Sequence, residues 1–337
     1  MVTIKNILKA YGVHPYRIEQ VSQRLYKVSD GHHVYALKHS RLTENTVAAW
    51  EHVYHQAYAL QLSTILPVYL TRQSHLYVTA EDSYYYLTPW IPDHQPSYEQ
   101  VIRDACEAIG EVHARTRRVI SIDTASIISH FSDYQRKNAE SYHALLKYVD
   151  RFERNRYMSP FELQVCTHFH VLVKVFAELD HHIGRFIDEL ESEHEWYGSL
   201  CHGHLALSHF RHHRQTYLLN WEQAAYDHPV VDLSRLLHSL TRHYDQQPTQ
   251  LSDLFSAYNR YNPLKTSERH LLTIYLLDPS HYIALIDQYI TNHNQQTMIK
   301  WTQLLEAAFR RIKLGLEWAE LAEFTDDSSK SADESET

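Results

Sequence analysis

Histidines gather in one short segment of this sequence. Five of them lie between residues 202 and 213: His202, His204, His209, His212 and His213. Neutral imidazole is a good ligand for zinc, copper and nickel, so a transition-metal site is one chemistry that this segment could support. The chain has 27 histidines among its 337 residues, however, and at that density a few close neighbours arise by chance. We therefore expect no metal ion here and keep the metal site as an alternative.

Composition excludes several other chemistries. The chain has only 7 glycines and no G-x-G-x-x-G or Walker A motif, so a glycine-rich phosphate loop is excluded. Its formal net charge of −9 argues against a protein that binds nucleic acid through the phosphate backbone. The three cysteines, Cys106, Cys166 and Cys201, form no C-x-x-C pair. Neither a disulfide framework nor a zinc ribbon is therefore expected.

The hydropathy of the chain indicates a soluble protein. No apolar run approaches the roughly 18 residues of a membrane span, and the N-terminus lacks the apolar core of a secretory signal. We expect synthesis in the cytoplasm, without a signal peptide. Protonation of histidines cancels the negative net charge slightly below neutral pH, and the sequence pI is about 6.3. Loss of charge repulsion at that pH makes self-association an option.

Residues 1–92 have the periodicity of a small sheet with helices. In chain order the pattern predicts a short helix within 1–20, a β-hairpin at 18–38, a helix at 43–62 and strands at 65–71, 75–79 and 83–88. The hairpin turn is expected at Asp30-Gly31, a pair that suits such turns. The first helix is expected to stop at Gly12.

The rest of the chain reads as mostly helical. Helical periodicity begins at Ser97 and is interrupted between Trp196 and Asp232, where short strands and turns cluster. The end, TDDSSKSADESET, contains no large apolar residue, so we expect it to be disordered. The expected organisation is a β-rich lobe at 1–92, a helical lobe at 93–324 with a strand-loop segment at about 196–235, and an acidic tail at 325–337.

This order of elements resembles the protein kinase architecture, and three stretches carry the resemblance. Tyr35-Ala36-Leu37-Lys38 resembles the strand with the phosphate-pairing lysine. CHGHLALSHF at 201–210 resembles the H-G-D-x-x-x-x-N catalytic loop of aminoglycoside phosphotransferases and choline kinases. LNWEQAAYDHPVVDL at 219–233 is similar to the metal-binding I-D-W-E-x-A-x-x-x-D-P-x-x-D-L segment. The resemblance implies an α+β, bilobal, protein kinase-like fold.

Within that superfamily, two strings are most similar to spore coat proteins of the CotS/YsxE type from endospore-forming bacteria. They are YALKHSR at 35–41 and YYYLTPWI at 84–91. This resemblance implies a structural or assembly protein that is made in the mother cell and incorporated into the spore coat. Its expected partners are other coat proteins.

The positions that would carry phosphoryl transfer have changed. The chemistry needs a carboxylate to orient the attacking hydroxyl, a carboxylate for Mg²⁺ and an asparagine for a further metal contact. By the resemblance, these three positions are occupied by His204, Asn220 and His209, respectively. Because Mg²⁺ prefers oxygen ligands, such a set is a poor site for it. We expect a pseudokinase with no catalytic residue and no cofactor.

The positions that hold the shape of the kinase site are retained. By the resemblance, His202, Gly203 and Asp232 brace the catalytic loop. A vestigial nucleotide cleft would use Lys38, Glu51 as the partner of Lys38, and Thr88: by resemblance these are the cofactor-binding positions.

Two alternatives from other functional classes remain open. The first is an atypical small-molecule phosphotransferase, in which Glu222 or Asp227 takes over metal binding. The second is a module that binds a nucleotide or a sugar without turnover.

Overall fold

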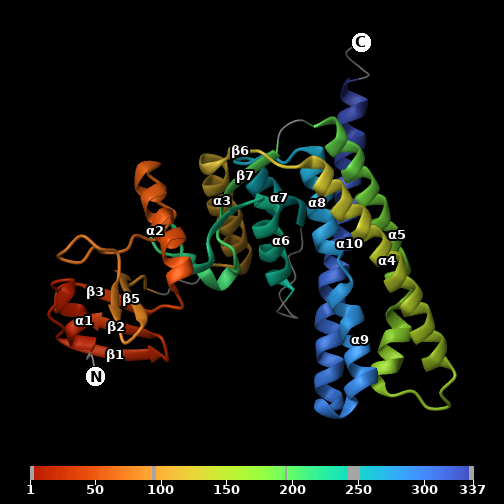
Figure 1. Ribbon diagram of the computed structural model, residues 1–337, viewed down its shortest axis with the longest axis horizontal. Coiled ribbons are helices and arrows are strands. Elements are labelled where there is room, and N and C mark those ends of the chain that lie inside the picture. The colour runs from red at the N-terminus through yellow and green to blue at the C-terminus, as the bar shows by residue number, and fades with distance from the viewer. Residues whose placement is uncertain (1–3, 93–95, 194–195, 242–250, 334–337) are drawn as a thin grey trace. The chain divides into compact units, whose positions relative to one another are not determined.

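The computed structural model describes residues 4–92, 96–193, 196–241 and 251–333 (Figure 1). The fold is α+β, with a small antiparallel sheet near the N-terminus and helices over most of the remainder. The chain divides into two compact units. The first comprises Met1–Arg118, Gly198–Asp232 and Leu254–Asn262; the second comprises Val119–Tyr197, Leu233–Asp253 and Pro263–Thr337. These units differ from the expected lobes, because residues 93–118 and the 198–232 segment group with the N-terminal sheet.

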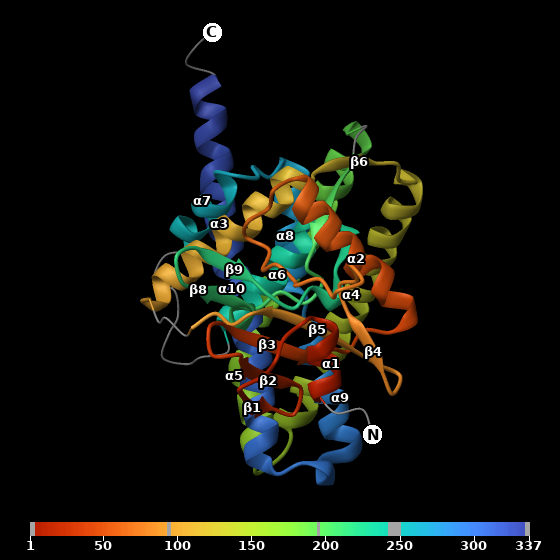
Figure 2. The same ribbon diagram turned by 90° about the vertical axis from the view of Figure 1, so that its left-hand side faces the viewer.

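The N-terminal sheet has the strand order β1-β2-β3-β5-β4 (Figure 2). Its strands are β1 (Arg17–Ser22), β2 (Leu25–Ser29), β3 (Val34–His39), β4 (Val78–Ala80) and β5 (Ser83–Pro89). The turn between β2 and β3 lies at Asp30-Gly31, as the sequence predicted. There Asp30 Oδ1 accepts the backbone N–H groups of His32 at 2.9 Å and His33 at 2.7 Å. All neighbouring pairs are antiparallel, and the buried residues of the sheet come from β2, β3, β4 and β5.

Helix α1 (Ile4–Ala10) covers the buried face of this sheet. Its Ile7 and Leu8 belong to the same apolar cluster as Val28, Leu37 and Leu87 from three strands. The helix ends before Gly12, whose φ of +75° is the left-handed conformation that glycine tolerates best. The predicted N-terminal helix is therefore confirmed, and its burial explains the apolar spacing.

The region between β3 and β5 departs partly from the prediction. Helix α2 (Glu44–Ala59) forms as expected and buries Trp50 and Val53. Residues 65–71 do not form a strand; Pro67 offers no N–H to a strand partner, and Leu66 N donates to Leu218 O at 3.2 Å in another part of the unit. Of the run 75–79, only its end enters the sheet, as part of β4.

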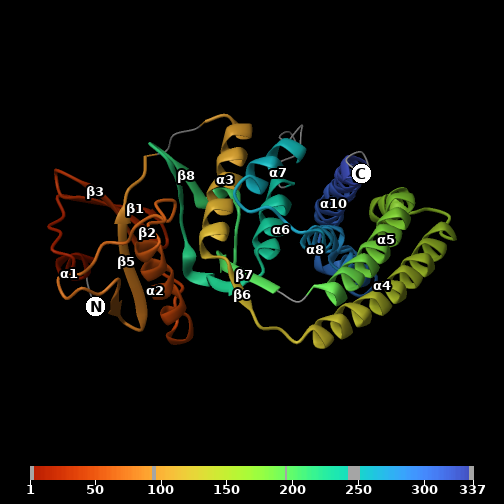
Figure 3. The ribbon, with the colours of Figure 1, turned by 90° about the horizontal axis from the view of Figure 1, so that it is seen from above.

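The remainder of the first unit is built around helix α3 (Tyr98–Thr116). It packs against the hairpin of β8 (Phe210–His212) and β9 (Thr216–Leu218) (Figure 3). Strand β7 (Trp196–Cys201) pairs antiparallel with β10 (Ala225–Asp227). Short 3₁₀ turns η1 (Leu207–His209) and η2 (Trp221–Gln223) follow β7 and β9, and helices α6 (Pro229–Leu240) and α7 (Leu251–Asn259) follow β10. The first unit includes α6 only up to Asp232 and α7 from Leu254 onward. The interrupted helical pattern at 196–232 thus corresponds to these hairpins.

The second unit is mainly helical. Its elements are β6 (Arg118–Ile120), which begins at the unit boundary, α4 (Thr124–Glu153), α5 (Pro160–Ser192), α8 (Thr266–Leu277), α9 (Ser280–Asn292), η3 (His293–Gln295) and α10 (Met298–Asp333). Helix α5 packs against α4, α8 and α10. It starts with a capping box: Ser159 Oγ accepts from Glu162 N, and Ser159 N donates to Glu162 Oε2. No helix within the described parts of the chain has the length and apolar character needed to span a membrane.

The predicted disorder at 325–337 needs correction. Helix α10 continues to Asp333, so residues 325–333 are helical, while 334–337 lie outside the described residues. The first half of α10 is anchored by buried Trp301, Leu305 and Ile312. Once a helix is nucleated by packing, adding polar residues to its end costs little, and for that reason the polar composition did not stop it.

Two buried histidines meet in the second unit. His182 of α5 and His270 of α8 approach with their Nδ1 atoms 2.8 Å apart, and both side chains are buried. Burial, followed by the proximity of His270 and His181, lowers the pKa of His182 from 6.5 to about 3. His182 is therefore neutral in the folded protein at any pH near neutrality.

We predict that acid destabilises the protein partly through His182. Between a pKa of about 3 in the folded state and 6.5 in the unfolded state, only the unfolded chain takes up the proton. Stability therefore falls as the pH is lowered through this range, by up to about 1.4 kcal/mol per pH unit for one such histidine. In His182→Gln, urea midpoints measured from pH 7 to pH 4 should decline less steeply than in the wild type.

The matched control is His181→Gln, which changes the exposed neighbour on the same helix. Its midpoints should decline as steeply as those of the wild type. Identical slopes for the two variants would contradict the role of His182.

Candidate functional site

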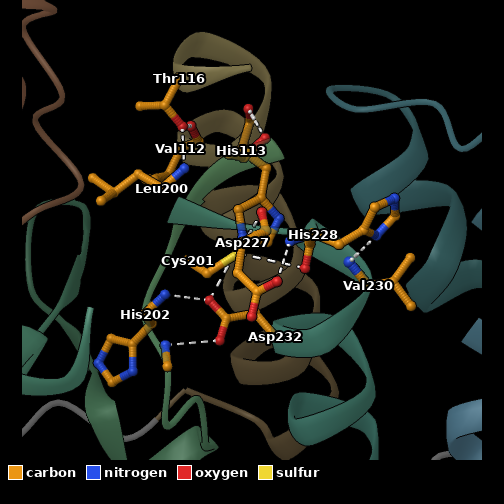
Figure 4. A network of polar contacts seen from close by, with 12 residues as sticks. Val112, His113, Thr116, Leu200, Cys201, His202, Asp227, His228, Val230 and Asp232 are labelled. Carbon is orange, nitrogen blue, oxygen red and sulfur yellow. Dashed lines mark hydrogen bonds and ion pairs between the residues drawn. The ribbon is translucent and has the colours of Figure 1, made fainter. Parts of the chain in front are cut away.

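The buried carboxylate of Asp232 fixes the start of the 201–210 loop (Figure 4). Its Oδ1 accepts from Gly203 N at 3.0 Å, and its Oδ2 accepts from His202 N. Gly203 has a φ of +78°, and a Cβ atom there would collide with the carbonyl of Gln223. Burial raises the pKa of Asp232, but the nearby imidazoles of His113 and His202 and the His202 N–H more than offset this, so the net shift is downward. The structure thus brings together the three residues expected to brace the loop.

The side chain of His202 joins this loop to the segment before η2. Its Nε2 lies 2.7 Å from the carbonyl oxygen of Leu219, and its Nδ1 accepts from His204 N at 3.3 Å. These two contacts require the proton on Nε2 and none on Nδ1. Burial, the largest influence, lowers the pKa of His202. A neutral, buried His202 is therefore part of the loop framework.

Lys38 is held by two groups from the segment after β9. Its Nζ lies 2.5 Å from Glu222 Oε1 and 2.5 Å from Asn220 Oδ1. Asn220 adopts the left-handed conformation, with φ +66° and ψ +52°, which asparagine tolerates better than most residues. With its backbone in this conformation, Asn220 directs its side-chain Oδ1 at the ammonium group of Lys38. The amide at the expected metal position therefore contacts an ammonium group.

Glu222 accepts further hydrogen bonds on the same oxygen. Tyr86 OH donates to Oε1 at 2.9 Å and Ser40 Oγ at 3.3 Å. Burial alone raises the pKa of Glu222, but the ammonium of Lys38, a backbone N–H and the Tyr86 hydroxyl lower it overall. Burial also lowers the pKa of Lys38, with Glu222 opposing that shift. The result is a mostly buried, charge-neutral pair.

The partner of Lys38 differs from the expected one. Glu51 of α2 was the expected partner, but in the part of the chain that the structure describes the ion pair of Lys38 is with Glu222. Local sequence favoured Glu51, which lies on the helix directly after β3, whereas Glu222 is distant along the chain and reaches Lys38 only through the fold. Thr88, the other expected cleft residue, is buried in β5, and its Oγ1 lies 3.3 Å from the carbonyl oxygen of Pro89.

The histidines at the positions that the resemblance assigns to catalysis lie in different environments. His204 is exposed, whereas His209 is half-buried. The ring of His209 lies 5.0 Å from that of His202 and 5.7 Å from that of His204, measured between centroids. Burial, and then the neighbouring histidines and Lys38, lower the pKa of His209 to about 4. At neutral pH His209 is uncharged and a weak base.

The five histidines of 202–213 do not converge on one point. His212 Nδ1 lies 3.1 Å from Asp104 Oδ2, on α3, and His213 is exposed. Within the described ranges, the group of His, Cys and acidic side chains whose ligand atoms lie within 4.8 Å of one another is His113, Cys201 and Asp232. The described structure therefore does not gather these five side chains around one point.

The side chains near Lys38 do not fit a magnesium–nucleotide complex. Asn220 replaces the main metal carboxylate, and its oxygen contacts Lys38. The carboxylate beside it, Glu222, is neutralised by the same lysine and accepts three side-chain contacts on one oxygen. Mg²⁺ requires several oxygen ligands in near-octahedral geometry. Binding it here would require Glu222 to leave its present partners.

Comparison with known proteins gives the fold. An aminoglycoside phosphotransferase from Alicyclobacillus acidocaldarius is similar over 96% of this chain and 97% of its own, at 16% identity and a TM-score of 0.69. The chain has a protein kinase-like fold. Spectinomycin phosphotransferase APH(9)-Ia, in complex with ADP and spectinomycin, is similar over 94% and 97% of the two chains, at 11% identity and a TM-score of 0.55. Amicoumacin kinase hAmiN is similar over 90% of each, at 12% identity and a TM-score of 0.51.

A family model matches part of this kinase-like chain. Residues 180–314 match the family described as "Spore coat putative kinase YutH". Among curated proteins there is no match. The family match and the fold confirm the resemblance to kinase-like spore coat proteins, and the matched range contains the segments 201–210 and 219–233.

Sequence reasoning missed some members of the site. Tyr86 and Ser40 were not considered, although Tyr86 lies directly opposite Lys38 in the β3–β5 register. Glu222 was considered only as a substitute metal ligand. The Trp221-Glu222 pair of the 219–233 segment drew attention to this glutamate, but no sequence pattern shows that its carboxylate reaches β3.

We predict that Asp232→Ala destabilises the protein and that His204→Ala does not. Removing the Asp232 carboxylate leaves two buried N–H groups without acceptors, which costs roughly 1–3 kcal/mol. The exposed side chain of His204 should contribute less than about 0.5 kcal/mol. Urea midpoints of the two variants provide the measurement. Equal midpoints would show that Asp232 does not hold the loop.

Proposed function

We propose that this chain is a structural or assembly component of the spore coat, and that its kinase-like cleft does not transfer phosphate from Mg-ATP. The family match over 180–314 supports the coat assignment. In this proposal other coat proteins are its partners and the coat is its location. The geometry around Lys38 supports the second half of the proposal.

The ion pair between Lys38 and Glu222 is the observation that carries the loss of activity. In phosphotransferases of this fold, a strand lysine pairs with nucleotide phosphates. Here the 2.5 Å contacts with Glu222 and Asn220 already satisfy that ammonium group. A phosphate would have to displace a carboxylate that is close, buried and hydrogen-bonded. The cleft is thus stable without a ligand.

General base catalysis lacks a suitable group as well. A base that accepts a proton from a hydroxyl works best with a pKa near the operating pH. The pKa of His209, about 4, is far below that. His204 stands where the resemblance places the carboxylate base, and its side chain is exposed rather than aligned by neighbours. No residue of the loop is therefore set up to activate a substrate hydroxyl.

One observation favours an atypical phosphotransferase as the second candidate. Glu222 is a mostly buried carboxylate two residues after Asn220, and it would become a metal ligand if Lys38 turned to a phosphate. Asp227 is less suited: its side chain is exposed, and its Oδ1 accepts from His228 N at 2.7 Å. Glu222 is accordingly the residue that separates the two candidate functions.

We predict background rates of ATP hydrolysis and phosphoryl transfer. Purified protein should show no turnover of γ-labelled ATP with Mg²⁺ or Mn²⁺, because the metal carboxylate and the base are both replaced. Glu222→Ala and Asp227→Ala should leave this background unchanged. Metal-dependent turnover that disappears in either variant would overturn the proposal and establish the atypical phosphotransferase.

Thermal-shift measurements with a panel of nucleotides test the remaining alternative, a module that binds a nucleotide without turnover. Wild type and Lys38→Met are compared with and without Mg²⁺ or Mn²⁺. A stabilisation by nucleotide that needs no metal and is lost in Lys38→Met would identify a binding module without turnover. No shift in either protein is expected if Glu222 keeps Lys38.

The coat assignment is tested in sporulating cells. We predict that a fluorescent fusion of the full chain accumulates at the spore coat. His204→Ala should localise equally well, since its side chain is exposed and an assembly role does not need a residue at the catalytic position. Asp232→Ala should localise poorly because its fold is weakened. A wild-type fusion spread through the mother cell would contradict the assignment.

A further inference from the structure

Three side chains that the proposed function does not use as ligands converge beside the loop. They are His113 of α3, Cys201 at the end of β7 and Asp232 in the first turn of α6 (Figure 4). Their ligand atoms all lie within 4.8 Å of one another. All three are almost fully buried, with exposed fractions of 0%, 1% and 0%. Three elements distant in sequence thus place a nitrogen, a sulfur and an oxygen around one point.

The Nε2 atom of His113 is the unusual feature of this group. It is buried and faces Asp232 Oδ2 at 3.6 Å, and no hydrogen bond of 3.5 Å or shorter reaches it from the described atoms. That separation is too long for a good hydrogen bond. Two zinc ligands at about 2.0–2.1 Å from the metal in a tetrahedral arrangement lie about 3.4 Å apart. The spacing of these two atoms therefore suits ligands that share a metal.

The surroundings hold the group in that orientation. His113 Nδ1 lies 2.9 Å from Tyr258 OH, which in turn accepts from Asn262 Nδ2 at 2.8 Å. Such an outer partner orients a metal-binding imidazole and fixes its tautomer. The Asp232 carboxylate is fixed by the backbone N–H groups of the loop. The ligand positions are thus set by packing before any ion binds.

We propose that His113, Cys201 and Asp232 bind a structural zinc ion. Imidazole nitrogen, thiolate sulfur and carboxylate oxygen are all ligands of zinc. The thiol proton of Cys201 would leave to solvent on binding, and one thiolate and one carboxylate then neutralise Zn²⁺. The carbonyl oxygen of Asp227, 3.4 Å from Cys201 Sγ, is the candidate fourth ligand. Such an ion would tie α3 and β7 to the residue that braces the loop.

The test compares two buried cysteines of the same unit. Zinc is measured by mass spectrometry in purified wild-type protein, Cys201→Ser and Cys106→Ser. Cys106 is the matched control because it is equally buried, on α3, and outside the group. We expect about one zinc per chain in the wild type and in Cys106→Ser, and a loss of about tenfold or more in zinc affinity in Cys201→Ser. A chelator should lower the Tm of the wild type and of Cys106→Ser, but not that of Cys201→Ser.

A measurement on the wild-type chain tests the proposal without depending on whether the Cys201→Ser variant folds. Chelator-treated wild-type protein is titrated with Co²⁺, and a thiolate-to-cobalt charge-transfer band with tetrahedral d–d bands is expected. The proposal would be overturned if the purified wild-type protein contains no zinc and also shows no such band when Co²⁺ is added. Equal zinc contents in Cys201→Ser and Cys106→Ser, with both folded, would overturn it too.

Discussion

A buried carboxylate holds the central loop of this protein in place. Both oxygens of Asp232 accept backbone N–H groups of the loop, at His202 and Gly203. An uncompensated charge in this position would be costly, so the hydrogen bonds and the two nearby imidazoles are a condition for burying it. Gly203 is required because any side chain would meet the carbonyl of Gln223. The loop keeps its kinase-like shape through this interaction, independently of phosphoryl transfer.

A second charge balance lies around Lys38. Lys38, which the resemblance places opposite nucleotide phosphates, lies 2.5 Å from Glu222. Asn220, in left-handed conformation, adds an amide oxygen to the same ammonium. A lysine without such partners would be expensive to bury. The protein therefore satisfies the charge of this ammonium group with its own side chains.

Local signals predicted much of the fold. The Asp30-Gly31 turn and the apolar spacing of the first helix identified elements because short-range sterics and burial of one face decide both. The strand expected at 65–71 failed, since Leu66 pairs with Leu218, more than 150 residues away, rather than with a sheet neighbour. The expected disorder at 325–333 failed because α10 is nucleated by packing upstream. Long-range contacts decided both of these segments.

The sequence by itself determined the residue types at the motif positions, with His204 and Asn220 where the resemblance implies carboxylates, because a residue type at a fixed spacing can be identified without the fold. It also indicated the brace at Asp232 from motif spacing. Only the tertiary structure decided that Lys38 pairs with Glu222 rather than Glu51. It alone brought Cys201 to within reach of Asp232, beside a histidine of α3. Pairing of charges and convergence of ligands depend on distances across the fold, and spacing along a chain does not specify such distances.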